Sequence, residues 1–184
     1  MLGFAEVEEI VKSSYTSHGG IGRCVYPISE DVIMKVPHNL FDQEGIDQTY
    51  AEIDFYKWYF EDYSDLMCKM LYVLEVPRFN VATNTSNSLT CPVLFMERVS
   101  PLVHAVELRD FLGVTEAYYS SIIDFIHKWY PREQATEKAN QVIDFIAETN
   151  LEDAWSNFSN WGITKEGHLV IIDCGMHGER EEYW

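Results

Sequence analysis

Residues 160–175 read NWGITKEGHLVIIDCG, and this stretch decides the fold. A glycine turn at 165–167 leads into an apolar strand, 168–172, that ends at Asp173. The segment before the turn begins at Asn160, so Asn160 and Asp173 lie on the two arms of a predicted hairpin. Side-chain oxygens of this kind, together with nucleotide phosphates, are ligands that a hard cation such as Mg²⁺ prefers. A plain β-turn with a capping aspartate is the alternative explanation.

A single lysine interrupts the apolar strand that we predict over 32–36. A buried ammonium is costly unless an anion pairs with it, so Lys35 calls for a carboxylate or a phosphate. Glu52 lies seventeen residues further on, in a helix predicted over 46–63, and is our first candidate partner. An outward-facing lysine on an edge strand is the alternative. Two other acids are candidates for the same pairing: Glu44 and Asp54.

A glycine cluster precedes the strand predicted over 23–27. Glycine allows backbone N–H groups to approach a phosphate closely, which predicts a phosphate-binding loop at this place. A tight turn uses the same residue type, so both interpretations stay open. The cluster consists of Gly19, Gly20 and Gly22.

The spacing of apolar residues predicts the remaining elements. Helices are expected over 4–12, 104–112, 115–130 and 133–148. Strands are expected over 70–76 and 92–99, with a polar turn at 80–90 between them. A sheet with one long helix, followed by helices and a small hairpin, predicts an α+β fold with two lobes.

Length, composition and charge exclude several classes of protein. A length of 184 residues suits one domain. The N-terminus carries acids where a signal peptide would carry bases, so we expect no export. The apolar runs are only as long as strands, so we expect no membrane span. Four cysteines without a paired motif indicate a reduced, cytoplasmic setting. A formal charge of −17 repels nucleic acid and anionic lipid, so we expect neither as a direct partner. Three explanations of this negative charge stay open: solubility, a basic protein partner, or mimicry of nucleic acid toward a protein that binds it.

The order of these parts resembles the protein-kinase-like superfamily, and it looks most like the small kinases carried by some bacterial viruses. The likeness extends over about residues 15–175. It implies a minimal bilobal fold in a single domain, 1–184, with an N-lobe over about 1–99 and a C-lobe over about 100–184. It also implies ATP and Mg²⁺ as cofactors.

The resemblance also implies a role for each candidate residue. Cofactor binding would fall to Gly19, Gly20, Gly22, Lys35, Met96, Glu97 and Val99. Within this set the glycines form the phosphate loop, the lysine contacts phosphates with Glu52 as its helix partner, and the last three form a hinge with Met96 as gatekeeper. Asn160 and Asp173 would hold the metal, with Cys174 in the place of the usual phenylalanine.

The catalytic loop departs from the kinase pattern. Kinases place an aspartate five residues before the metal-binding asparagine, where it orients the attacking hydroxyl, and Trp155 stands at that position here. Asp153 reaches the same space if the loop to Asn160 carries two extra residues, with Glu152 as the next candidate. Only nine residues follow Gly175, so we expect no activation segment.

Two functions follow from this resemblance. The first is an ATP-dependent phosphotransferase acting on a hydroxyl of a protein or small molecule, with Asp153, Lys35 and Glu52 as catalytic residues. The alternative is a pseudokinase that binds nucleotide and presents its acidic surface to a protein partner.

Overall fold

The computed structural model describes residues 2–13, 22–80, 83, 85–101, 131–149 and 160–174. These residues divide into two compact units. The first contains the described residues of Met1–Lys57 and of Lys69–Arg98, and the second contains those of Trp58–Cys68 and of Val99–Cys174. One break between the units therefore falls between Arg98 and Val99.

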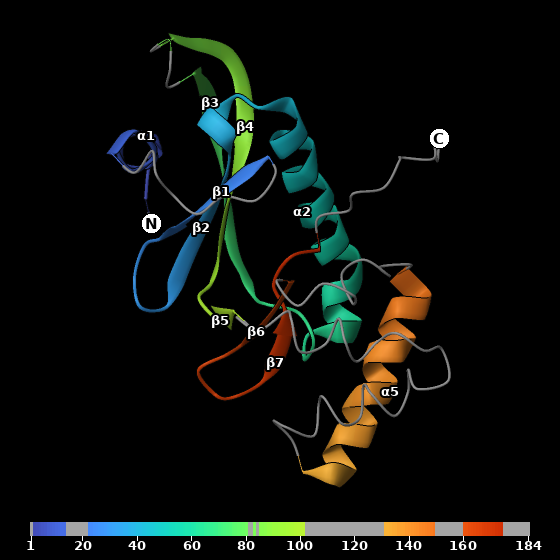
Figure 1. Cartoon of the computed structure of the whole chain (residues 1–184). Helices are drawn as coiled ribbons and strands as arrows, with labels where there is room; N and C mark the ends of the chain where they lie inside the picture. The colour runs from blue at the N-terminus through green and yellow to red at the C-terminus, as the bar shows by residue number, and fades with distance from the viewer. Residues whose placement is uncertain are drawn as a thin grey trace, which may run out of the picture. The chain divides into compact units, whose positions relative to one another are not determined.

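The first unit is built on a four-stranded antiparallel sheet with the strand order β1-β2-β4-β3 (Figure 1). Its strands are β1 (Arg23–Pro27), β2 (Val32–Pro37), β3 (Met70–Asn80) and β4 (Thr85–Glu97). The turn between β1 and β2 closes where the N–H groups of Ile28 and Ser29 both donate to the carbonyl of Val32. The structure confirms β1 as predicted and extends β2 by one residue.

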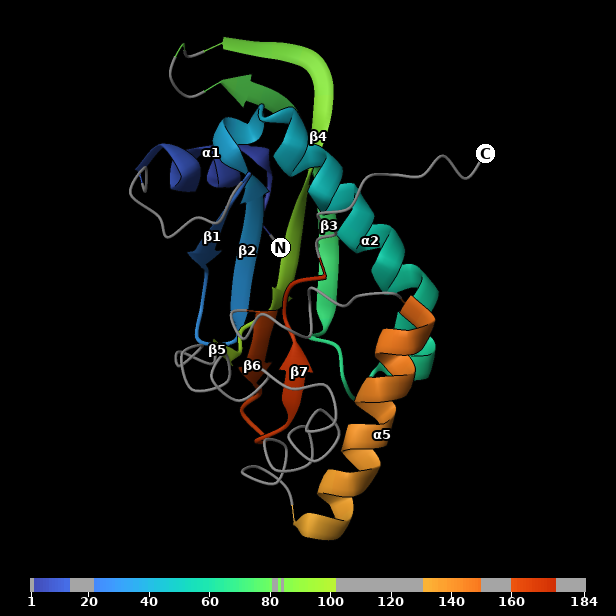
Figure 2. The same ribbon diagram turned by 45° about the vertical axis from the view of Figure 1, so that its right-hand side comes forward.

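The polar segment after β3 is a strand, and our expectation of a long turn at 80–90 is wrong. The ladder between β3 and β4 continues to the pair Asn80↔Thr85, so the connection is short. This outer part curls over at its end (Figure 2). Residues 85–90 are all exposed, which explains their polar composition. The polarity of residues 85–90 reflects their exposure and not their backbone conformation, because a strand that is exposed on both faces needs no apolar residues.

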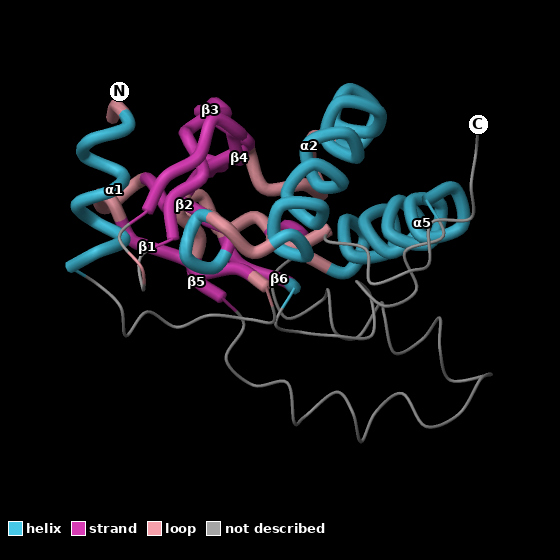
Figure 3. The backbone as a smooth tube through the Cα atoms, turned by 90° about the horizontal axis from the view of Figure 1, so that it is seen from above, coloured by secondary structure: helices cyan, strands magenta, loops and turns pink. Residues whose placement is uncertain are grey.

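The helices of the first unit lie on opposite sides of this sheet (Figure 3). Helix α1 (Phe4–Ser13) agrees with the predicted leading helix and buries Val7 and Val11 in one core with Met34 and Val36 of β2. Lys35 lies between those two strand residues, and side chains alternate along a strand, so Lys35 points to the other face.

Helix α2 (Gln43–Tyr63) begins three residues earlier than the predicted helix. Asp42 accounts for the difference, because its Oδ2 accepts the N–H of Gly45 at 2.8 Å and caps the first turn. A short 3₁₀ helix, η1 (His38–Leu40), connects β2 to this cap. The apolar periodicity that predicted the helix starts only at Ile46, which is buried.

The second unit contains a small sheet with the order β5-β6-β7. Its strands are β5 (Ser100–Pro101), β6 (Trp161–Ile163) and β7 (Leu169–Ile171). The β6–β7 hairpin closes at Gly167, whose φ of 88° suits glycine, and it agrees with the hairpin predicted from residues 160–175. No pattern of residues predicts β5, because a strand of two residues has no periodicity.

Helix α5 (Arg132–Thr149) agrees with the helix predicted over 133–148. It buries Val142 and Phe145 completely, while Trp161 is fully buried as well. Tyr63 packs its ring edge against Phe145 at 5.0 Å between centroids. The helices predicted over 104–112 and 115–130 lie outside the described residues.

The described elements confirm the predicted α+β class, with an antiparallel sheet and one long helix in the first unit. Across the part of the chain that the structure describes, no helix is both long and apolar enough to cross a membrane.

Candidate functional site

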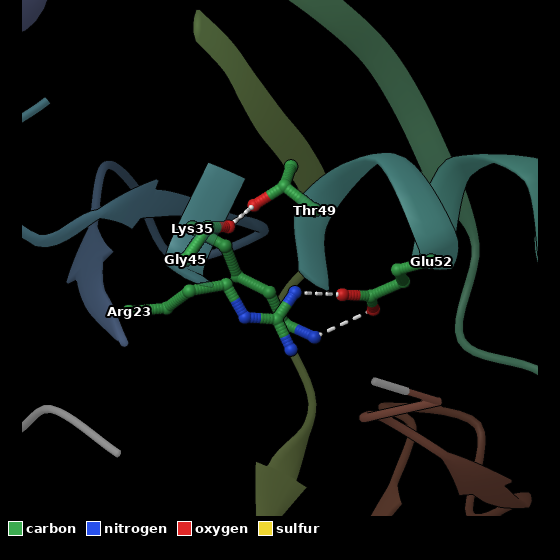
Figure 4. A network of polar contacts seen from close by, with 5 residues as sticks. All are labelled: Arg23, Lys35, Gly45, Thr49 and Glu52. Carbon is green, nitrogen blue, oxygen red and sulfur yellow. Dashed lines mark hydrogen bonds and ion pairs between the residues drawn. The ribbon is translucent and has the colours of Figure 1, made fainter. Parts of the chain in front are cut away.

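Three charged side chains meet inside the first unit (Figure 4). The Nζ of Lys35 lies 2.7 Å from Oε1 of Glu52, and the guanidinium of Arg23 donates to the other carboxylate oxygen, Oε2. All three side chains are at least nine-tenths buried, with exposed fractions of 7, 6 and 4% for Arg23, Lys35 and Glu52. We call these residues the buried trio.

The strand register explains why Arg23 and Lys35 reach the same carboxylate. Lys35 is opposite Val25 in the β1–β2 ladder, and Arg23 lies two residues from Val25 on β1. Residues two apart on a strand share a face, so Arg23 and Lys35 project to the same side of the sheet. Helix α2 brings Glu52 to that side from the turn after Thr49, whose hydroxyl donates to the carbonyl of Gly45 at 2.6 Å (Figure 4).

The structure decides which acid pairs with Lys35. Glu52 is 3% exposed, whereas Asp54 is exposed and pairs with Lys57 at 3.1 Å, and Glu44 is exposed. An outward lysine on an edge strand is therefore excluded, because β2 lies between β1 and β4 and Lys35 is buried.

The side chains of the buried trio carry a net positive formal charge. Among the described residues, the charged side chains that are buried are Arg23, Lys35 and Glu52. Two cations and one carboxylate give these three side chains a formal charge of +1, within a chain whose formal charge is −17. A positive charge in a weakly polar interior acts on an anion more strongly than the same charge at the surface does.

Arg23 was not among the residues predicted for the site. The signal that identified Lys35, a cation within an apolar strand, is weaker for Arg23 because it is the first residue of β1. Sequence periodicity gives no indication of burial at the end of a strand. Only the register of β1 against β2, together with the position of α2, shows that Arg23 reaches Glu52.

Gly22 has a structural explanation in the described residues. Its φ is 83°, a conformation that side chains with a Cβ rarely adopt, and its carbonyl accepts the N–H of His38 at 2.9 Å. A Cβ on Gly22 would also approach the N and Cα of Gly45 to 3.3 Å. These features favour the turn interpretation at this position, while Gly19 and Gly20 lie outside the described residues. A phosphate role for any of the three stays a prediction.

The predicted hinge is divided between the end of β4 and the segment after it. Met96 is 3% exposed and pairs with Ile33 and Met70 in the sheet. The N–H of Glu97 donates to the carbonyl of Lys69, the residue before β3, at 2.9 Å, so this N–H group is already engaged. Val99 follows the end of β4. Contact of these residues with adenine is untested.

Asn160 and Asp173 lie at the same end of the β6–β7 hairpin. The N–H of Ile172 donates to the carbonyl of Asn160 at 2.7 Å, which makes Asn160 and Ile172 neighbours and places Asp173 one residue beyond. Both candidate ligands are half-buried. The backbones of the two candidate ligands therefore lie at the same end of the hairpin, and metal binding by their side chains stays a prediction.

Among the described residues, no three His, Cys, Asp or Glu side chains form a group suited to a metal ion. A site of one asparagine, one aspartate and nucleotide phosphates would not form such a group, so this finding does not test it. Asp153 lies outside the described residues. The buried trio and the Asn160–Asp173 pair belong to different units, and each is described within its own.

No family model and no curated protein matches the chain. A solved structure of the GDP complex of wild-type aminoglycoside 2'-phosphotransferase-IIIa is similar with a TM-score of 0.40 and 12% identity, covering 83% of this chain and 51% of that chain. A GDP complex of a mutant of that enzyme gives a TM-score of 0.38 and 11% identity, over 83% and 52% of the two chains. The chain thus spans about half the length of these structures, and this similarity does not assign it to a family.

Proposed function

We propose that the chain binds ATP with Mg²⁺ and transfers the γ-phosphoryl group to a hydroxyl of a protein or small molecule. The observation that carries this proposal is the buried ion pair between Lys35 of β2 and Glu52 of α2, at 2.7 Å. A buried lysine held by a helix glutamate is the arrangement with which kinases position nucleotide phosphates.

Each part of the proposed site has a separate task. Lys35 contacts phosphate oxygens, and Glu52 keeps its ammonium in place. The oxygens of Asn160 and Asp173 hold the metal ion. A bound nucleotide would supply the phosphoryl group, and a metal ion held by Asn160 and Asp173 would neutralise part of its charge. Asp153 accepts a hydrogen bond from the acceptor hydroxyl and takes its proton as the hydroxyl oxygen bonds to the γ-phosphorus, while the bond from that phosphorus to the bridging oxygen breaks and ADP leaves.

Nucleotide binding is the first step to test. Isothermal titration with ATP and Mg²⁺ should give a saturable signal for wild type and a strongly reduced one for Lys35→Ala. Glu52→Gln should weaken ATP binding less than Lys35→Ala, because it loosens the position of the lysine without removing it. If Asp54→Asn weakens ATP binding more than Glu52→Gln does, the assignment of Glu52 is wrong.

Transfer is tested with ATP labelled at the γ-phosphate. Label should pass from ATP to the protein itself, to a component of cell lysate or to an added small-molecule alcohol. Asp153→Asn should lower this transfer strongly and leave ATP binding nearly unchanged, since a neutral amide is a poor proton acceptor. Equal transfer by wild type and Asp153→Asn would exclude Asp153, and Glu152 would be the next residue to test.

A pseudokinase is the second candidate, and the residue at position 155 favours it. Trp155 occupies the place where kinases carry the aspartate that orients the acceptor. In this case ATP binds, no acceptor receives label, and the acidic surface of the chain binds a protein partner, a basic one by charge complementarity. Binding of ATP without transfer to any acceptor would support this function against the first. A cytoplasmic location is part of both proposals.

A further inference from the structure

We propose that Arg23 is a positioning residue of the phosphate site, which holds Glu52 against Lys35 and makes the site selective for ligands that carry phosphate. This inference rests on the proposed function, because it concerns how the same site recognises a nucleotide. Arg23 would not touch the reacting atoms. It acts through Glu52 and through the charge that it brings.

The geometry of Glu52 is the first argument. Its carboxylate has two oxygens, and each is engaged by a different cation, Oε1 by Lys35 and Oε2 by Arg23. A carboxylate held at both oxygens cannot rotate without breaking one of these contacts. Arg23 therefore fixes the orientation in which Oε1 of Glu52 faces the ammonium of Lys35. In this way Arg23 positions Lys35 through Glu52.

The charge is the second argument. Lys35 and Glu52 alone would be formally neutral, and a neutral pair has little long-range attraction for a polyanion. With Arg23 the trio carries a formal charge of +1, although the chain as a whole carries −17. Replacing Arg23 with a neutral residue would thus remove the positive charge of the trio while leaving the Lys35–Glu52 contact available.

The backbone around Arg23 is the third argument. Gly22 directly precedes it, and the carbonyl of Gly22 accepts the N–H of His38 and lies against Gly45 of α2. The start of β1 is therefore fixed to the first turn of the helix that carries Glu52. An arginine whose backbone is held in place can fix the orientation of the carboxylate of Glu52, whereas an arginine on a mobile backbone would move together with that carboxylate.

The experiment compares ATP with adenosine, a ligand without phosphate. Dissociation constants of both, with Mg²⁺ present, are measured by titration for wild type, Arg23→Met, Arg23→Lys and Arg78→Met. Arg78 is the matched control, because it is half-buried on the same sheet, donates to the carbonyl of Thr90 and is not part of the trio. Its substitution changes the net charge of the chain as much as Arg23→Met does.

Arg23→Met should weaken ATP binding about tenfold or more and change adenosine binding less than about twofold. Arg23→Lys should recover part of the ATP affinity, because it restores the charge but not the planar guanidinium whose Nη1 donates to Oε2 of Glu52. Arg78→Met should leave both constants as in wild type.

Other outcomes overturn the inference in different ways. If Arg23→Met binds ATP like wild type, the inference fails while the proposed function stands. If Arg23→Met weakens ATP and adenosine by the same factor, Arg23 only supports the fold of the unit. If wild type binds neither ligand, the proposed function fails and the inference fails with it. Should Arg23→Met not fold, the ATP-to-adenosine ratio of Arg23→Gln is compared with that of Arg23→Lys, and equal ratios would overturn the inference.

Discussion

A Cβ atom placed on Gly45 would lie 2.0 Å from the carbonyl oxygen of Gly22. The backbone before β1 and the backbone of the first turn of α2 are therefore in direct contact, and a glycine at position 45 is what permits it. The same carbonyl accepts the N–H of His38 at 2.9 Å. This contact joins the strand that carries Arg23 to the helix that carries Glu52.

Gly45→Ala should lower the stability of the protein by about 2 kcal/mol or more, since the atom that it meets belongs to the backbone and cannot move cheaply. Helix propensity alone predicts the opposite sign, a gain of up to about 1 kcal/mol. Urea unfolding of the variant decides between the two. Gly3→Ala is the control, since its Cβ would meet nothing closer than 3.8 Å and its stability should be near that of wild type.

Glu52→Gln should destabilise the fold more than Lys35→Met does. Glu52 is shared by two cations, so its loss leaves Arg23 and Lys35 buried beside each other without their carboxylate, at a cost of about 3–5 kcal/mol. Lys35→Met leaves the pair of Arg23 and Glu52 in place and should cost at most about 2 kcal/mol. The free energies of unfolding in urea provide the measurement.

We expect the opposite order for nucleotide affinity, since the proposed function predicts that replacing Lys35 weakens ATP binding more than Glu52→Gln does. Asp54→Asn is the control for both measurements, because Asp54 lies in an exposed pair with Lys57 and should change stability by less than about 1 kcal/mol. A larger loss of stability for Lys35→Met than for Glu52→Gln would contradict the shared position of Glu52.

Phe79→Ala should cost about 3–5 kcal/mol, although it lies in the outer part of the β3–β4 hairpin. Phe79 is 5% exposed, and the ammonium of Lys12 from α1 lies 4.4 Å from its ring centre. Leu89→Ala in the facing strand removes a side chain that is 55% exposed and should be nearly neutral. Thermal unfolding of both variants tests this, and equal effects would mean that the outer hairpin does not anchor α1.

Cys24 should be the thiol that reacts fastest with a disulfide reagent in the native protein at pH 8. All four cysteines are free, and Cys68, Cys91 and Cys174 are at most 5% exposed, whereas Cys24 is half-buried. Burial raises the pKa of Cys91 to about 12, so its reactive thiolate is scarce while the protein is folded. Cys24→Ser should remove the fast phase. A second fast thiol in that variant would contradict the burial of the other three.

Ionisation of the Cys91 thiol should lower the stability of the fold at alkaline pH. Its pKa is raised in the folded state from the usual 9.0, so folding favours the neutral thiol. That contribution to stability is complete below about pH 9 and is lost as the pH rises through about 12. Cys91→Ala should therefore unfold with a flatter pH profile than wild type between those values.

Most elements of the described fold follow from local sequence signals. Lys35, a charged residue within the apolar strand β2, indicated a buried ion pair. The apolar strand β7, which ends shortly before Asp173, indicated a hairpin at this place. The start of α2 was misplaced because the helix begins with polar residues and its cap, Asp42, precedes any apolar period. The outer part of β4 was taken for a turn because exposed strands and turns share a polar composition.

The contacts that local signals cannot predict are those between elements that are distant in the chain. Arg23 reaches Glu52 across twenty-nine residues, and Gly22 meets Gly45 across a similar separation. Each depends on the register between β1 and β2 and on the place of α2 beside them. The sequence indicated that Lys35 needs an anion and favoured Glu52 as its partner, and the structure confirms this pair and places Asp54 beside Lys57 instead.

The central proposal is that the chain binds ATP with Mg²⁺ and that both Lys35 and Asp173 are needed for this binding. The most direct measurement is the shift in melting temperature that millimolar ATP with Mg²⁺ produces in wild type, Lys35→Ala and Asp173→Ala. Ligand binding stabilises the native state by mass action, so wild type should melt several degrees higher with ATP and Mg²⁺ than without, and both variants should lose most of this shift. An unchanged melting temperature for wild type would contradict the claim, as would a full shift in Lys35→Ala.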